Sequence, residues 1–185
     1  MIVLYIFLGV CVIGFVWFIG LYNGLVRIKN HCDESWSDID TELKRRYNLI
    51  PNLVETVKGY ASHEKETLDR VIQARNQAMA NNGSPKEQAQ DENVLIGGLR
   101  QLFALSESYP DLKANQNYLQ LQEELANTED RIQRARRFYN GNVRDLANRI
   151  EVFPSNIVAG MCNFSKREYF ELDDEAQRAL PKVEF

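Results

Sequence analysis

Hydrophobic and polar positions divide this chain into two parts. The first 26 residues contain no charged side chain and are mostly apolar. About 20 apolar residues, at about 1.5 Å per residue in a helix, match a hydrocarbon core of about 30 Å. Residues 1–26 are therefore predicted to form a transmembrane anchor. A cleaved signal peptide is the alternative, but this stretch lacks the basic n-region and small-residue cleavage motif that define one.

Basic residues follow the anchor and none precedes it. Arg27 and Lys29 come directly after the apolar segment, and residues 44–46 add three more cations. Lysine and arginine close to a transmembrane segment resist translocation. We therefore expect a single-pass protein of the inner (cell) membrane, with its N-terminus outside and residues 27–185 in the cytoplasm.

Beyond the anchor, apolar residues recur at steps of three and four, which is the pattern of amphipathic helices. The first such stripe predicts one long helix that begins near Trp36 and ends before the Asn-Asn-Gly turn at residues 81–83. Pro51 lies inside it, where a proline removes one hydrogen bond and crowds the preceding turn. Ile50 is a poor N-cap for a new helix. A kinked, continuous helix is therefore favoured over a break.

A second helix is predicted to begin after Ser84. Serine is a good N-cap, Pro85 suits the first helical position, and Glu87 completes a capping box. A third helix of nearly 40 residues follows the turn at Tyr109 and Pro110 and is expected to end at Pro154.

Short helical segments are predicted after the third helix, at residues 155–160 and 173–180. Long amphipathic helices joined by short turns bury their stripes against one another. The predicted fold is all-α: a transmembrane helix at residues 1–26, followed by an antiparallel bundle of about four helices with short C-terminal helices at residues 27–185. No sheet is predicted, because Tyr169–Leu172 is too short to form one.

Charge and composition narrow the function classes. The 22 basic and 26 acidic residues leave a net charge of −4, so a surface for nucleic acid is not expected. The two histidines, His31 and His63, lack the Glu-x-x-His and His-Glu-x-x-His spacings of metal sites. No glycine-rich phosphate loop or nucleophile-base pair stands out. We therefore expect no enzyme activity, no metal and no cofactor.

Three charged residues lie at or near the apolar stripes: Glu64, Glu129 and Arg136. The favoured interpretation puts them at the margin of the bundle, with buried stems and solvated heads. The alternative is a buried polar layer that sets the register of the helices. Arg45 and Arg46 are likewise interpreted as a solvated face beside the apolar stripe.

Several long, ordered runs stand out along the chain: RRYNLIPNLVETVKGYASHE at residues 45–64, ESYPDLKANQNYLQLQEELANTEDRI at 107–132, RRFYNGNVR at 136–144, FPSNIVA at 153–159 and YFELDDEA at 169–176. Together they resemble the bacterial LemA family. The resemblance covers nearly the whole chain, including the anchor. Local departures occur at Asn48, at residues 146–147 and at Asn163.

The resemblance implies a single-pass membrane protein with a short external N-terminus and a cytoplasmic antiparallel bundle of about four helices. It implies no enzymatic activity, and it links some members of the family to membrane organisation.

Our first functional hypothesis is a non-enzymatic scaffold or adaptor that organises itself or partner proteins at the inner membrane. Tethering raises local concentration, so weak lateral contacts favour assembly. We expect contact with membrane lipid through one transmembrane helix and homo-oligomers, with other membrane proteins as further candidate partners. Direct membrane shaping ranks last, because residues 33–42 are acidic and an interfacial helix needs a basic face.

The alternative function is a small-ligand-binding or enzymatic bundle with a pocket near the Pro51 kink, since a kink exposes backbone carbonyls. The candidate interaction residues are Arg45, Arg46, Pro51, Asn52, Tyr109 and Pro110.

Overall fold

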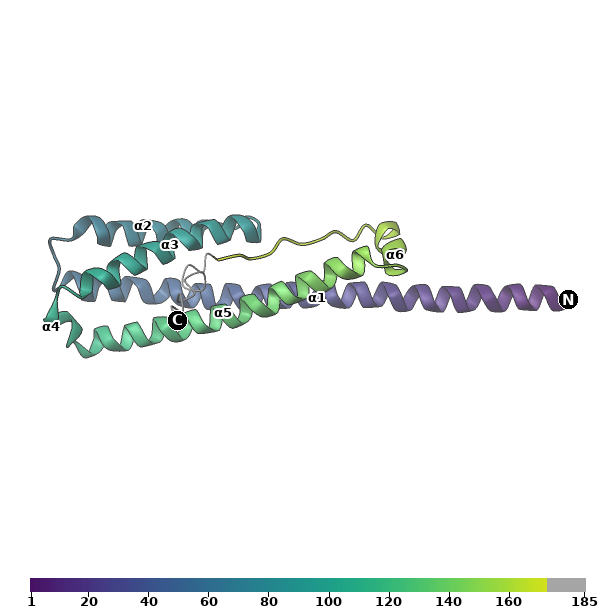
Figure 1. The fold of residues 1–185 in the computed structure, drawn as a ribbon, viewed down its shortest axis with the longest axis horizontal. Coiled ribbons are helices and arrows are strands. Elements are labelled where there is room, and N and C mark those ends of the chain that lie inside the picture. The colour runs from purple at the N-terminus through teal and green to yellow at the C-terminus, as the bar shows by residue number, and fades with distance from the viewer. Residues whose placement is uncertain (173–185) are drawn as a thin grey trace, which may run out of the picture. The chain divides into compact units, whose positions relative to one another are not determined.

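The computed structural model describes residues 1–172, and over this range it contains helices and irregular segments without a strand (Figure 1). The all-α prediction is confirmed, whereas the predicted helix at residues 173–180 lies outside the described range. Two compact units share the chain: residues 1–40 with 133–169, and residues 41–132 with the segment from residue 170. The helices are α1 (Ile2–Lys58), α2 (Lys65–Ala80), α3 (Pro85–Ser106), α4 (Pro110–Lys113), α5 (Gln116–Glu151) and α6 (Ser155–Met161).

Helix α1 contains both the predicted anchor and the first stretch of the bundle. Among the described residues it is the one helix long and apolar enough to cross a membrane, and none of its most apolar window is buried. Pro51 lies inside α1 without ending it, so the prediction of a continuous helix at this proline is confirmed.

The predicted single helix from Trp36 towards residue 80 is wrong in two respects: it does not begin near Trp36 but continues from the apolar segment in α1, and a turn at residues 59–64 divides it into α1 and α2. In Figure 1, α2 runs back antiparallel to the end of α1. Gly59, which costs about 1 kcal/mol in a helix relative to alanine, follows directly after α1. Ala61 is 1% exposed and its N–H donates to the Val57 carbonyl. Ala61 would be buried in a continuous helix, and it is also buried in this turn. The spacing of the apolar residues therefore did not reveal the break.

The predicted start of α3 is confirmed in detail. The Ser84 hydroxyl accepts a hydrogen bond from the Glu87 N–H, the Glu87 carboxylate accepts one from the Ser84 N–H, and Pro85 occupies the first turn. Helices α2 and α3 form an antiparallel pair (Figure 1). A Cβ added at Gly98 would lie 3.4 Å from the Val71 side chain, so the absent side chain allows the two helices to approach closely.

The predicted third helix divides into the short α4 and the 36-residue α5. The Asn115 side chain accepts a hydrogen bond from the Tyr118 N–H at 3.0 Å, which favours a fresh start for α5. The helical turns predicted at residues 155–160 are confirmed as α6.

The predicted apolar stripe forms much of the core, and each of its members from Ile39 to Ala78 is buried. In the first unit, α1 packs on α5 through the Trp36 and Tyr139 rings, whose centroids lie 5.3 Å apart. The Asn142 amide donates to the Ser35 hydroxyl at 3.1 Å in the same contact. In the second unit, the largest fully buried apolar side chains are Leu43, Ile50, Leu53, Leu95, Leu102, Leu112, Tyr118 and Phe170.

Candidate functional site

A buried cluster of charged side chains lies in the second unit, centred on Arg46. The Arg46 side chain is 1% exposed, and its Nη1 donates to Glu129 Oε2 at 2.7 Å. Its Nη2 donates to Glu92 Oε2, and the Tyr47 hydroxyl donates to the other Glu92 oxygen. Glu92 is also 1% exposed, whereas the Glu129 side chain is 48% exposed. One guanidinium therefore joins carboxylates of α3 and α5 to α1.

The local sequence explains why these charges face inward. Arg46 lies three residues after Leu43 and four before Ile50, and both of these apolar side chains are buried. Residues three and four apart share a helix face, so Arg46 points with them into the bundle. Glu92 lies three residues before the buried Leu95 of α3, and Glu129 lies four residues after the buried Leu125 of α5. Each helix thus carries one charged residue in an apolar face.

The interpretation of Arg45 and Arg46 as one solvated face is wrong for Arg46. Adjacent residues on a helix point about 100° apart. Arg45 is accordingly 55% exposed and lies 3.8 Å from the Glu42 carboxylate. Burial of Arg46 is possible because α3 and α5 bring Glu92 and Glu129 to it, and the sequence pattern of α1 alone contains no sign of these partners.

The three charges considered at the margin of the bundle have different outcomes. Glu129 has its predicted half-exposed position, yet its carboxylate reaches the buried Arg46. Glu64 is the N-cap residue of α2 and lies in no helix interior. Arg136 is half-buried in the first unit and is not part of the Arg46 cluster. A buried polar layer is therefore present, with Arg46 and Glu92 at its centre.

The chemistry of the cluster favours a structural role. Both terminal nitrogens of Arg46 and both oxygens of Glu92 are engaged by protein groups, and Arg75 of α2 donates to the Tyr47 carbonyl oxygen at 2.8 Å. Arg46 Nε is the remaining guanidinium nitrogen, buried and without a hydrogen-bond partner in the described part of the chain. A buried charge network of this kind is costly to break, because removal of one partner leaves the other charge buried without compensation.

The other candidate interaction residues do not form one site. Pro51 is half-buried in α1, and the exposed Asn52 uses its carbonyl oxygen to accept a hydrogen bond from Thr56 at 2.8 Å. Tyr109 is the N-cap residue of α4, and its hydroxyl donates to Glu64 at 3.4 Å. Pro110 is exposed at the start of α4. None of these residues lines either of the two cavities described next.

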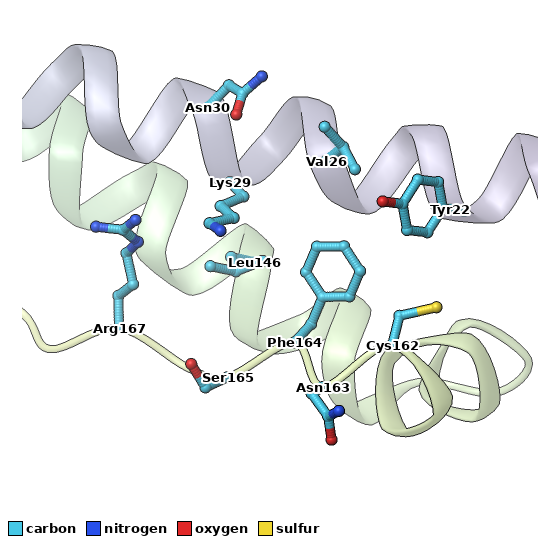
Figure 2. Close-up of a pocket in the computed structure, with 10 residues that line it drawn as sticks. All are labelled: Tyr22, Val26, Lys29, Asn30, Leu146, Cys162, Asn163, Phe164, Ser165 and Arg167. Carbon is cyan, nitrogen blue, oxygen red and sulfur yellow. The ribbon is translucent and has the colours of Figure 1, made fainter.

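A cavity of about 700 Å³ lies in the first unit, between α1, α5 and the segment after α6 (Figure 2). Lys29 and Arg167 line it, and Arg167 is already bound to the Asp33 carboxylate. Tyr22 and Phe164 close one end through an edge-to-face contact with ring centroids 5.9 Å apart. Sequence reasoning missed this cavity, because its basic residues come from segments almost 140 positions apart.

Beside this cavity the same unit buries Cys32 and Tyr139. The Tyr139 hydroxyl is removed from solvent and donates to the Glu168 carbonyl oxygen at 2.9 Å. Burial, opposed in part by the Arg167 charge, raises the pKa of Tyr139 to about 12. Burial also raises the pKa of the Cys32 thiol, so neither group is poised to act as a base or nucleophile near neutral pH.

A second cavity, of about 490 Å³, lies in the other unit beside the turn that precedes α5. Tyr60, Asp111 and Asn115 are among its lining residues. The Asn115 amide donates to the Tyr60 hydroxyl at 2.9 Å, so these polar groups already serve to hold the turn.

Comparison with known proteins identifies a family match and several relatives. The model of the LemA family matches residues 35–185. Protein LemA of Metamycoplasma hominis is 31% identical over 160 residues, which cover 85% of this chain and 71% of that protein.

Two further relatives are magnetosome proteins. Magnetosome protein MamQ 2 of Paramagnetospirillum magneticum is 25% identical over 175 residues, and magnetosome protein MamQ of Magnetospirillum gryphiswaldense is 24% identical over 174 residues. These matches cover 81% and 80% of this chain but 64% of each MamQ protein.

We predict that Arg46→Met lowers the free energy of unfolding by about 3–5 kcal/mol, because it leaves the Glu92 carboxylate buried without its cation. The variant Arg45→Met, at the neighbouring exposed site, serves as the matched control. It should change the free energy of unfolding by less than about 0.5 kcal/mol. Denaturant unfolding of the detergent-solubilised full chain, followed by circular dichroism, measures both. Replacing Arg46 and Glu92 together by methionine should restore much of the loss. Equal effects of the two single variants would contradict a structural role for the cluster.

We further predict that the stability difference between the unchanged chain and Tyr139→Phe depends on alkaline pH. A tyrosine whose pKa is raised on folding contributes stability below its unfolded pKa of about 10 and loses it as pH rises towards the folded value. The unchanged chain should therefore lose stability relative to Tyr139→Phe between about pH 10 and 12. Thermal unfolding of both chains across this range provides the measurement, and a constant difference would contradict the burial of this hydroxyl.

Proposed function

We propose that this chain, which belongs to the LemA family, is a membrane-anchored helical scaffold or adaptor without enzymatic activity. In this role it organises itself or partner proteins at the inner membrane. The observation that carries the proposal is α1 itself. Its exposed apolar part has the length and composition to cross a membrane, and the same helix then supplies Arg46 to the buried charge cluster.

Helix length supports this role. The 32 residues of α1 from Arg27 to Lys58 and the 36 of α5 correspond to about 48 Å and about 54 Å at the standard rise. Long helices with charged outer faces offer extended surfaces for lateral contacts. An anchored protein also meets its neighbours at raised effective concentration, so that weak contacts suffice for assembly.

The relatives add a further argument. The MamQ proteins are named as magnetosome proteins, which favours a role in organising a subcellular structure over the turnover of a small substrate. Because this chain spans 64% of their length, only this general role is carried over.

For the topology, we propose that the N-terminus lies outside the cell and the bundle in the cytoplasm. The support is the position of Arg27 and Lys29 directly after the apolar segment, since basic residues near a span tend to remain inside.

A small-ligand-binding or enzymatic bundle is the second candidate function. The observation in its favour is the cavity beside Lys29 and Arg167, which has the size of a ligand pocket. The scaffold remains first because Asp33 already neutralises Arg167, and because the cavity does not include the residues near Pro51.

The scaffold proposal predicts that the full chain, extracted with its surrounding membrane in polymer-bounded discs, has a protein mass that is a discrete multiple of 21.4 kDa. Native mass spectrometry measures this mass directly. A single copy that carries the mass of a second protein would support the adaptor form. A bare monomer across a wide range of concentrations would contradict both forms.

The topology predicts that a cysteine introduced by Asn82→Cys, in the exposed turn between α2 and α3, is shielded from a membrane-impermeant maleimide in intact cells. It should become labelled after permeabilisation. The unchanged chain, with its three native cysteines, provides the background signal. Labelling of the introduced cysteine in intact cells would place the bundle on the outer side.

A further inference from the structure

Helix α6 presents an apolar face that nothing in the described part of the chain covers. Phe153, Ile157 and Met161 are 73%, 52% and 69% exposed. Ile157 and Met161 are four residues apart and share one side of the helix, and Phe153 lies in the turn just before it. Val152, beside them, is 58% exposed. Large apolar side chains that cluster on a surface mark a site of interaction with a partner or a membrane.

The opposite face of α6 packs on the apolar segment of α1. Val158 and Ala159 are each 1% exposed and form one cluster with the fully buried Leu25. Phe18 and Leu21 pack against the same cluster. All three α1 residues precede Arg27, the first charged side chain of the sequence. Helix α6 therefore lies beside the part of α1 that is predicted to be within or at the boundary of the membrane.

The segment around α6 is also free of charge. Residues 152–165 contain no Asp, Glu, Lys or Arg, although these make up 26% of the sequence. Cations lie at both ends of the segment: Arg149 before it and Lys166 after it, the latter bound to Glu151. A Cβ at Gly24 would lie 2.8 Å from Arg149 Nη1, so this guanidinium rests against α1 just before Arg27.

This distribution is that of a chain segment at a membrane interface. Apolar side chains enter the boundary of the acyl chains, while charged side chains such as those of Arg149 and the Lys166–Glu151 pair remain level with the headgroups. Helix α6 packs on Leu21 and Leu25 of α1, and the nearby α1 side chains Trp17, Ile19 and Tyr22 are exposed and apolar. If this part of α1 lies in the membrane, lipid is the occupant that the exposed side chains of α6 meet.

We propose that α6 is a second membrane contact, in which Ile157 and Met161, together with Val152 and Phe153 of the preceding turn, insert into the leaflet on the Arg27 side of the anchor. The inference rests on the proposed anchoring by α1 and adds a contact that the anchor does not require. It fixes the depth of the first unit at the membrane surface, since α6 and α1 are held together by the Leu25 cluster.

The test places a photoreactive benzoyl-phenylalanine at one position of the full chain, reconstituted in vesicles of phosphatidylethanolamine and phosphatidylglycerol. Ile157 reports on α6, with Met161 as a second position on the same face. Val10 reports on the anchor. Phe138, which is 60% exposed on α5 of the same unit and about 20 Å before the end of that helix, is the matched control. Mass spectrometry identifies lipid adducts and protein adducts after illumination.

We expect lipid adducts at Val10, Ile157 and Met161, with yields several-fold above that at Phe138. Adducts at Val10 without adducts at Ile157 and Met161 would overturn the inference and leave the anchoring intact. Crosslinks from Ile157 to a second copy of the chain, in place of lipid, would also overturn it. Absence of lipid adducts at Val10 would instead refute the anchoring itself.

Discussion

The buried guanidinium of Arg46 is the interaction on which the second unit depends. A charge that is 1% exposed pays a large desolvation cost, and the cost is offset only where partners of opposite charge reach it. Glu92 and Glu129 supply these partners from α3 and α5. Apolar stripes can slide past one another by a helical turn with little change in buried area, but this ion cluster forms in one register.

The first unit is organised by apolar and aromatic contacts. Trp36 packs on Tyr139, and Leu25 packs with Val158 and Ala159. These contacts bring the end of α5 and all of α6 to the part of α1 between Phe18 and Trp36, which begins inside the apolar segment. A membrane-facing surface arises from this arrangement because the outward side chains of α6 are themselves apolar, which connects the packing of this unit with the proposed function.

Patterns among residues close together in the chain predicted much of the fold, and the failures show what such patterns do not contain. The capping box at Ser84 was correct because its hydrogen bonds join residues three apart. The continuity of α1 at Pro51 was correct because Ile50 is a poor cap. The turn at residues 59–64 was missed because Ala61 is buried in the turn as it would be in a helix. Arg46 was misplaced because its partners come from helices 46 and 83 residues away.

The sequence by itself determined the apolar segment of α1, the helical class of the fold and most helix ends, since these depend on composition and on neighbours within one or two turns. Tertiary structure decided which charges are buried, where the cavity beside Lys29 forms and which face of α6 stays exposed. Those features depend on pairs of residues far apart in the chain. The sequence of one helix does not specify the charge or shape of the surface that packs on it. These are determined only when the helices pack together.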